Sequence, residues 1–167
     1  MNGEREARLC RLMTLYEREL LRMCYVYLRD LPLAEDATQE TFVKAYRHLA
    51  DFRGESAEKT WLMRIAINTC KDMRRAAWFR YVDRSVTPEQ APDPTEDVAA
   101  EDDALTCEVM RLPRKLMEVV LLYYYQGMTL EEIAQALGIT APSVSARLKR
   151  ARDKLRIALE GGPAHEE

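Results

Sequence analysis

The sequence is poor in metal-binding residues, with only 2 histidines among 167 residues. Its 4 cysteines form no CxxC pair and are scattered at Cys10, Cys24, Cys70 and Cys107. Zinc sites in proteins need clustered cysteine and histidine ligands, so we expect neither a metal nor any other cofactor. Because each cysteine falls within an apolar helical pattern, we expect small buried thiols rather than disulfide bonds or zinc ligands.

Other absences exclude further classes of protein. No apolar run approaches the roughly 20 residues that a membrane-spanning helix requires. The first residues, MNGEREARLC, lack the apolar core of a signal peptide, so we expect a cytoplasmic protein that does not insert into a membrane. No stretch alternates long enough to predict a sheet. The sequence also lacks a Ser/His/Asp set and P-loop glycines, so enzymatic activity is not expected.

The charged residues, by contrast, are numerous and unevenly distributed along the chain, although the net charge is only −3. Residues 41–82 carry 9 basic and 4 acidic side chains, and residues 111–158 carry the same numbers. Between these blocks, residues 83–110 carry 1 basic and 9 acidic side chains. Such asymmetry describes a protein's partners more than its fold. Two basic blocks separated by an acidic stretch favour two separate contacts with a polyanion.

The middle of the chain has the composition of a linker. Residues 83–103, DRSVTPEQAPDPTEDVAAEDD, contain 3 prolines, many acids and almost no large apolar side chains. On both sides of it, apolar residues recur at three- and four-residue steps, which predicts helices. We therefore expect an all-α protein in which two small helical domains, 1–82 and 104–160, are joined by a flexible acidic linker.

The second flank contains a helix-turn-helix pattern. TLEEIAQAL begins with Thr129 and Glu132 at the spacing of a capping box. Gly138 permits a sharp turn, and the next helix is expected to begin near Thr140 or Ala141. The apolar face of that helix comprises Val144, Leu148, Ala151 and Leu155.

The other face of this last helix is strongly basic. Between Ser143 and Arg156, only Asp153 offsets six cations. The alternative is an ordinary helical hairpin with a solvated face, but such faces usually mix signs, so we interpret the pair as a DNA-binding unit with a recognition helix. The first turns can then reach base edges, and later Arg and Lys side chains meet phosphates. The face comprises Ser143, Ser145, Ala146, Arg147, Lys149, Arg150 and Arg152.

The helix predicted at Lys59–Arg75 is divided in a similar way. One stripe comprises Leu62, Ala66, Thr69 and Met73, and another comprises Arg64, Asn68, Lys71 and Arg75. Trp61 lies near its start, and Trp78, Phe79 and Tyr81 follow its end. Aromatic rings beside cations and an amide suit single-stranded nucleic acid, because unstacked bases need a flat surface and the backbone needs neutralising. A core role for the rings, with cations that only solubilise, stays equally open from this helix alone.

Two further patterns favour ordinary structural roles when taken alone. A mixed-sign face is usually only solvated, with Glu40 and Lys44 as a weak pair. That face, in EDATQETFVKAYRHL, comprises Asp36, Gln39, Glu40, Lys44 and Arg47. The run YYY at 123–125 is interpreted as packing at a helix end rather than as a stacking platform.

Two long stretches contain these patterns: AEDATQETFVKAYRHLADFRGESAEKTWLMRIAINTCKDMRR and, after the linker, LPRKLMEVVLLYYYQGMTLEEIAQALGITAPSVSARLKRARDKL. Together they resemble a bacterial RNA polymerase sigma factor of the compact two-domain extracytoplasmic-function (ECF) group. Two motifs in the right order make this resemblance far more specific than a lone helix-turn-helix. It implies an all-α protein with two DNA-reading domains, docked on core RNA polymerase to start transcription at chosen promoters.

The resemblance also implies roles for individual residues. The first domain would hold the polymerase clamp helices through Asp36, Gln39 and Glu40. It would melt and read the −10 element of promoter DNA through Trp61, Arg64, Asn68, Asp72, Arg74 and Arg75. The second domain would read the −35 element through Ser143, Ser145, Ala146, Arg147, Lys149 and Arg150. In many members of the family an anti-sigma factor is a further partner.

One departure and two rival interpretations complete the prediction. Family members often carry a basic residue where this chain has Ser145, so their −35 preference does not carry over. An autonomous helix-turn-helix repressor would use the same Gly138–Leu155 stretch, but would need a dimer interface and a palindromic site. The linker and the second basic domain argue against it. An enzyme with an incidental helix-turn-helix ranks third. In the sigma-factor interpretation, the polymerase and not this chain would carry out the chemistry of bond formation.

Overall fold

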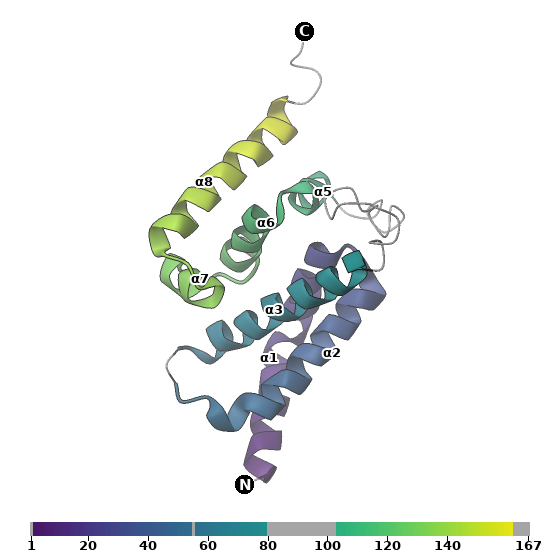
Figure 1. Ribbon diagram of the computed structural model, residues 1–167, viewed down its shortest axis with the longest axis vertical. Helices are drawn as coiled ribbons and strands as arrows, with labels where there is room; N and C mark the ends of the chain where they lie inside the picture. Colours follow the sequence, from purple (N-terminus) through teal and green to yellow (C-terminus); the bar gives the residue numbers. More distant parts are fainter. Residues whose placement is uncertain (1, 55, 80–102, 162–167) are drawn as a thin grey trace. The chain divides into compact units, whose positions relative to one another are not determined.

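A computed structural model describes residues 2–54, 56–79 and 103–161 of the chain (Figure 1). These residues form helices and helical turns and contain no strand, which confirms the all-α prediction. The chain divides into two compact units, Met1–Glu96 and Asp97–Glu167. Of the linker predicted at 83–103, only Asp103 lies within the described residues.

Three helices form the described part of the first unit. The helix α1 (Asn2–Leu28) packs along α2 (Leu31–His48), and both contact α3 (Glu58–Phe79) (Figure 1). A 3-10 turn, η1 (Leu49–Asp51), begins the connection from α2 to α3. The sequence predicted the third helix at Lys59–Arg75, so α3 is longer than expected.

The turn between α1 and α2 depends on two consecutive residues. Arg29 has a φ of 58°, and its backbone N–H donates to the Tyr25 carbonyl at 2.7 Å, which closes α1. Asp30 is extended, and its carboxylate accepts a hydrogen bond from the Leu33 N–H at 3.0 Å. Pro32 occupies the first turn of α2, where no helical hydrogen bond needs its missing N–H. The chain therefore reverses sharply and α2 returns along α1.

The core of the first unit follows the apolar period of its helices. Small side chains let α2 approach its neighbours, because Ala34, Ala37 and Ala45 are fully buried. Large side chains fill the remaining space at Leu12, Leu20, Met23, Tyr27, Leu62, Met63 and Ile67. The stripe predicted on α3 is buried at Leu62, Ala66 and Thr69 and half-buried at Met73. The predicted face of α3 is therefore its packing face.

The cysteines only partly follow the prediction of buried thiols. Cys24 and Cys70 are buried, but Cys107 is half-buried and Cys10 is exposed. The prediction is wrong for Cys10. This cysteine lies in the first part of α1, where Leu12 is the one nearby apolar residue that is fully buried. Among the described residues, no group of three or more His, Cys, Asp or Glu side chains could hold a metal ion.

The second unit is built from short helical segments. The last long helix, α8, packs against α6 and α7, while α5 contacts α6, α8 and η4. The segments are α5 (Ala104–Arg111), α6 (Arg114–Val120), the π-helical turn η3 (Leu121–Tyr125), α7 (Leu130–Leu137), α8 (Ala141–Arg156) and the π-helical turn η4 (Ile157–Gly161). Within the described part of the chain, no helix is both long and apolar enough to cross a membrane.

The helix-turn-helix forms where the sequence predicted it. Thr129 Oγ1 accepts from the Glu132 N–H at 3.1 Å, and Glu132 Oε1 accepts from the Thr129 N–H at 2.9 Å, so the capping box is present. Gly138 ends α7 in the left-handed region, with a φ of 69°. Thr140 then caps α8 by accepting a hydrogen bond from the Ser143 N–H at 3.2 Å. These local signals fix the two helices and the turn between them.

The predicted apolar face of α8 is buried at three of its four positions. Val144, Leu148 and Ala151 are buried where α8 packs against α6 and α7. Leu155 is only half-buried, because it borders a hollow of about 330 Å³ that residues of α5 and η4 also line. The opposite face of α8 is left to solvent.

Candidate nucleic-acid interface

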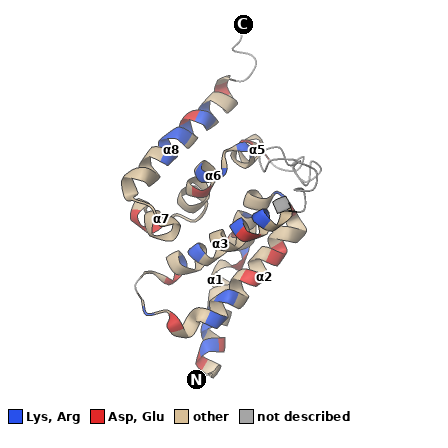
Figure 2. Cartoon of the chain, viewed as in Figure 1, with Lys and Arg blue, Asp and Glu red and all other residues tan. Residues whose placement is uncertain are grey.

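The polar face of α8 is exposed, and its basic side chains follow one another along the helix (Figure 2). Asp153 pairs with Arg156 at 3.1 Å, near the end of α8. Lys149 and Arg150 form no ion pair with any described residue. The one acidic residue therefore leaves the middle of the basic face unneutralised, and the face can attract a polyanion.

The N-terminal part of α8 carries small side chains. Ser145 and Ala146 are exposed, whereas Ser143 is half-buried. The Ser143 hydroxyl accepts a hydrogen bond from the Thr140 hydroxyl at 2.9 Å, so Ser143 takes part in the helix cap. Because Ser145 and Ala146 occupy little space, the backbone of this first part of α8 can approach another surface closely.

Arg152 is held by a residue outside α8. Its Nε donates to the Tyr124 hydroxyl at 2.7 Å, and its guanidinium lies 5.9 Å from the ring centroids of Tyr123 and Tyr124. The hydrogen bond to Tyr124 raises the pKa of Arg152, although burial opposes this shift. Tyr124 is 54% exposed, so interpreting the tyrosine run as packing alone is wrong for this residue. It lies in the π-helical turn η3 and orients an arginine of α8.

The candidate DNA-contacting side chains of α3 lie along one helix with different exposures. Arg64, Asn68 and Arg75 are exposed, as is Asp72. Arg74 is half-buried and Lys71 likewise. The side chains of Trp78 and Phe79, and the whole of Tyr81, lie outside the described residues. The exposed part of α3 therefore mixes cations, an amide and one carboxylate.

Trp61 belongs to an aromatic pair that the sequence did not predict. Its ring centroid lies 4.9 Å from that of Phe52, with the ring planes inclined at 35°. Both side chains are half-buried. Phe52 directly follows η1, so the pair joins the connection between α2 and α3 to the first turn of α3.

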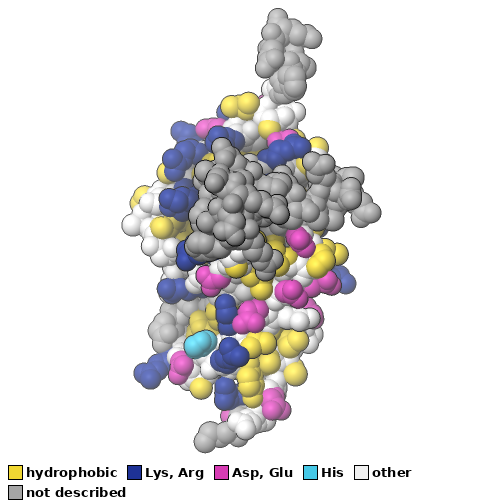
Figure 3. Space-filling view, turned by 45° about the vertical axis from the view of Figure 1, so that its right-hand side comes forward, with side chains coloured by type: hydrophobic (Ala, Val, Ile, Leu, Met, Phe, Trp, Pro, Cys, Tyr) yellow, Lys and Arg dark blue, Asp and Glu magenta, His cyan; other side chains and the backbone are white. Residues whose placement is uncertain are grey.

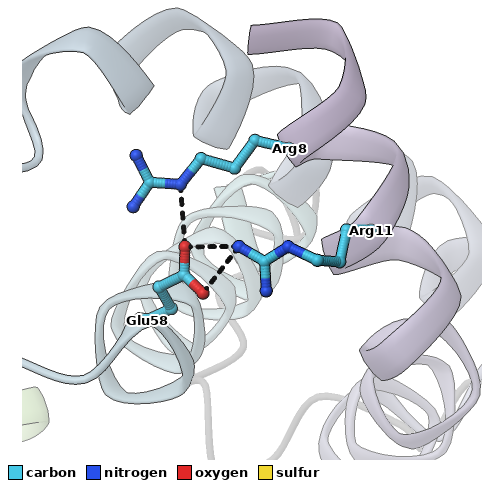
Figure 4. A network of polar contacts seen from close by, with 3 residues as sticks. All are labelled: Arg8, Arg11 and Glu58. Atoms are coloured by element: carbon cyan, nitrogen blue, oxygen red, sulfur yellow. Dashed lines mark hydrogen bonds and ion pairs between the residues drawn. The ribbon is translucent and has the colours of Figure 1, made fainter. Parts of the chain in front are cut away.

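Two arginines of α1 reach the first turn of α3 (Figure 4). Glu58 accepts a hydrogen bond from Arg8 Nε at 2.8 Å, and Arg11 Nη2 donates to both of its carboxylate oxygens, at 2.9 and 3.0 Å. Burial raises the pKa of Glu58, but the hydrogen bonds and charges of the two arginines outweigh it and lower that pKa. The bridge therefore contributes stability above the unfolded-state pKa and loses it as the pH falls through the lowered one.

The α2 face with the predicted polymerase contacts is open to solvent. Asp36 and Gln39 are exposed and Glu40 is half-buried, and Val43 lies on the same face with 43% exposure. Figure 3 shows one side of the first unit, where acidic, basic and apolar side chains adjoin one another on the surface. Such mixed surfaces occur at protein–protein contacts.

The predicted ion pair on this face is not formed. Lys44 reaches α3 instead, where its Nζ donates to Thr69 Oγ1 at 3.2 Å and lies 3.9 Å from Asp72 Oδ2. The pairing with Glu40 is wrong because α3 offers Lys44 a hydroxyl and a carboxylate that a lone helix does not. Glu40 keeps its charge available on the α2 face.

Comparison with known proteins decides what these two units are. Residues 12–80 match Sigma-70 region 2, and residues 102–155 match Sigma-70 region 4. The chain is 33% identical over 159 residues to the RNA polymerase sigma-H factor of Pseudomonas aeruginosa, covering 87% of this chain and 82% of that protein. It is 34% identical over 150 residues to the ECF RNA polymerase sigma-E factor of Haemophilus influenzae, covering 81% and 78%. The chain belongs to the ECF sigma factors.

Solved structures share the fold of this sigma factor. The sigma factor RpoE, in complex with the anti-sigma factor NepR from Bartonella quintana, matches with a TM-score of 0.76 and 23% identity over 90% of this chain and 95% of that one. CnrH, in complex with the cytosolic domain of CnrY, matches with a TM-score of 0.70 and 24% identity over 93% and 90%. At these identities the likeness concerns the fold alone.

Membership of the family gives this sigma factor its general function. Sigma factors direct RNA polymerase to promoters when transcription starts, and the two matched regions assign that function to the chain. The autonomous repressor is not favoured, since the first unit matches a sigma region of its own. Proteins of this family are generally non-enzymatic DNA-binding regulators.

Several residues that shape the two units of this sigma factor were not found from the sequence. The three-residue spacing of Arg5, Arg8 and Arg11 was a signal of one basic face on α1, although it did not identify the target. Tyr124 was noticed only as one of three tyrosines. Phe52 carried no local signal, because its partner Trp61 lies beyond an irregular connection.

Proposed function

We propose that this sigma factor divides promoter recognition between its units. Residues 1–82 bind core RNA polymerase and open and read the −10 element, residues 104–160 read the −35 element, and residues 83–103 connect them. Each unit has a helix whose exposed face carries cations, α3 in one unit and α8 in the other, and this observation carries the proposal. The polymerase supplies the chemistry, and the chain acts in the cytoplasm without catalysing a reaction of its own.

The −35 proposal rests on the surface of α8. The major groove of DNA admits one α-helix, and small side chains at its N-terminal end allow a close approach to base edges. Ser145 and Ala146 have that character, while Ser143 and Arg147 border them and are half-buried. Lys149 and Arg150 follow without an ion pair to any described residue, so they are suited to neutralise phosphates.

The −10 proposal rests on α3 and on the aromatic pair at its start. Opening a duplex exposes bases that need a flat partner, and Phe52 and Trp61 offer two adjoining rings. Arg64 and Arg75 are exposed cations, and Asn68 is an exposed amide that can bond a base edge. Asp72 lies 3.9 Å from Lys44, so its carboxylate offsets a lysine rather than repelling DNA unopposed.

The polymerase proposal rests on the face of α2. Asp36, Gln39 and Glu40 place two carboxylates and an amide beside the exposed side chain of Val43. A negative rim around an apolar side chain suits a partner surface that carries basic groups. By analogy with RpoE of Bartonella quintana, which was solved with NepR, we also propose that an anti-sigma factor regulates this protein.

Reconstitution with core polymerase tests the proposal as a whole. The purified chain is mixed with core enzyme and a library of promoter sequences, and transcripts are sequenced. We expect transcription only when the chain is present, from sites that share a −35 and a −10 element. A chain that instead binds palindromic DNA as a dimer and fails to copurify with core enzyme would be a repressor.

Replacing Asn68 with alanine tests the role of α3. We expect fewer open complexes, or a relaxed −10 preference, because one hydrogen bond to an exposed base is lost. Permanganate footprints of the holoenzyme on a promoter measure opening. Binding to core enzyme should stay unchanged, and Arg18→Ala, at an exposed position of α1, is the matched control. If footprints and promoter choice are unaltered, Asn68 has no part in reading the −10 element.

A further inference from the structure

Among the described residues of the connection between α2 and α3, few hydrogen bonds form within the connection itself. After η1, the Phe52 N–H donates to the Leu49 carbonyl at 3.3 Å, and Gly54 adopts a φ of 81°. Yet Phe52 is the residue of this connection that meets Trp61. Contacts from outside the connection can therefore contribute to the position of the aromatic pair.

Three arginines of α1 contact the connection at both ends and in its middle. At the end of α2, Arg5 Nη2 donates to the Tyr46 carbonyl at 2.7 Å, and its guanidinium lies 4.6 Å from the Tyr46 ring centroid. At the start of α3, Arg8 and Arg11 bind the Glu58 carboxylate. In between, the Arg8 guanidinium lies 5.4 Å from the Phe52 ring centroid.

Arg8 is the central member of this set because it contacts two elements at once. Its Nε donates a hydrogen bond to Glu58, and its planar guanidinium lies over the ring of Phe52. The ring of Phe52 in turn packs against that of Trp61. A guanidinium that is fixed by a carboxylate stacks on a ring with less loss of entropy than a free side chain. The carboxylate of Glu58 is itself favoured in the first turn of a helix.

We propose that Arg8, Arg11 and Glu58 are positioning residues that hold Phe52 and Trp61 ready to receive an unstacked base of the −10 element. This inference rests on the proposed −10 function of the first unit. The arginines act through the aromatic pair and do not read the base. Their effect therefore falls on strand opening and base preference, while attachment to the polymerase through α2 is untouched.

The first experiment compares single and double variants in the holoenzyme. Arg8→Gln is expected to lower the yield of open complexes about 5-fold to 10-fold, the lower part of the range that one base–aromatic stacking contact supplies. Phe52→Ala is expected to do the same or more. Because Arg8 acts through Phe52, the double variant should be no worse than Phe52→Ala alone. Losses that multiply would mean that Arg8 acts independently, for example on a phosphate, and would overturn the proposal.

A second measurement reports the aromatic pair directly. The chain has 2 tryptophans, so replacing Trp78 with phenylalanine leaves Trp61 as the only indole fluorophore. In that background, Arg8→Gln and Glu58→Gln should each shift the emission of Trp61 and raise its quenching by acrylamide, whereas Arg8→Lys should restore part of the signal. Arg18→Gln, which changes an exposed arginine of the same helix, is the matched control. If the emission of Trp61 is the same in Arg8→Gln and Glu58→Gln as in the parent protein, the proposal is wrong. This result holds even if one of the variants folds too poorly for the first experiment.

The proposed −10 function and the positioning role of the arginines can be tested separately. If the unmodified protein opens no promoter with core polymerase, the proposed −10 function is wrong. If it opens promoters and the Arg8 and Glu58 variants open them equally well, only the positioning role is wrong. Helical content from circular dichroism and copurification with core enzyme are measured for every variant.

Discussion

Replacing Asp36 and Glu40 together with arginine is expected to abolish association of the sigma factor with core RNA polymerase. Both side chains lie on the open face of α2, and the ion pair predicted between Glu40 and Lys44 is not formed. Reversing two charges would place positive groups against the basic partner surface that we propose. Like-charge contacts cost several kcal/mol, so binding should weaken by about 100-fold or more.

The variant should fold normally, because neither side chain belongs to the core. Copurification with core enzyme and circular dichroism measure the two properties separately. A matched control replaces Glu6 and Glu17 of α1 with arginine. Both positions are exposed, and the substitutions change the net charge by the same amount. Unchanged association of Asp36→Arg with Glu40→Arg, or an equal loss in the control, would remove the polymerase contact from this face.

Changing Ser145 to arginine is expected to alter which −35 bases the sigma factor prefers. Ser145 is exposed in the N-terminal half of α8, on the part of the helix proposed to face base edges. An arginine there can bond both acceptors of a guanine, a contact worth about 1–3 kcal/mol of discrimination. The preference for guanine at one position should therefore rise by about 5-fold to 150-fold, measured on a panel of −35 variants.

The cations further along α8 should behave differently. Losing Arg150 should weaken binding to all sequences alike and reduce the slope of affinity against salt by roughly one unit, because a phosphate contact carries no base information. Arg152→Ala should do the same, although Tyr124 holds this guanidinium in the free protein. If Arg150→Ala changes base preference and Ser145→Arg leaves it unaltered, α8 lies in the groove in the opposite direction.

Local chemistry explains which parts of the fold could be predicted. The capping box at Thr129 and the turn at Gly138 depend on partners within about one helical turn, and both form as expected. The apolar stripe of α3 is likewise a property of one helix. The π-helical geometry of η3, the turn that contains the exposed Tyr124, leaves no comparable pattern in the sequence.

The candidate site was less accessible to sequence reasoning because its contacts join distant residues. Arg8 and Glu58 are 50 positions apart, Tyr124 and Arg152 are 28 apart, and Lys44 and Thr69 are 25 apart. Periodicity shows that such side chains are polar and exposed, but helix packing chooses their partners. The role proposed for Asp36 came from the resemblance to sigma factors, since a mixed-sign helix face has no distinctive chemistry.

The bridge from Arg8 to Glu58 also bears on the order in which the first unit folds. α1 and α2 are joined at Arg29 and Asp30, whereas the bridge closes a loop of 50 residues. Longer loops cost more entropy to close, so we expect the α1–α2 hairpin to form before α3 brings Glu58 to Arg8.

Contacts made after the rate-limiting step of folding change mainly the rate of unfolding. Glu58→Gln should therefore speed unfolding in stopped-flow experiments with little change in refolding, whereas slowed refolding would place the bridge in the nucleus. The lifetime of the folded unit, more than the speed of its formation, would then depend on two arginines and one carboxylate.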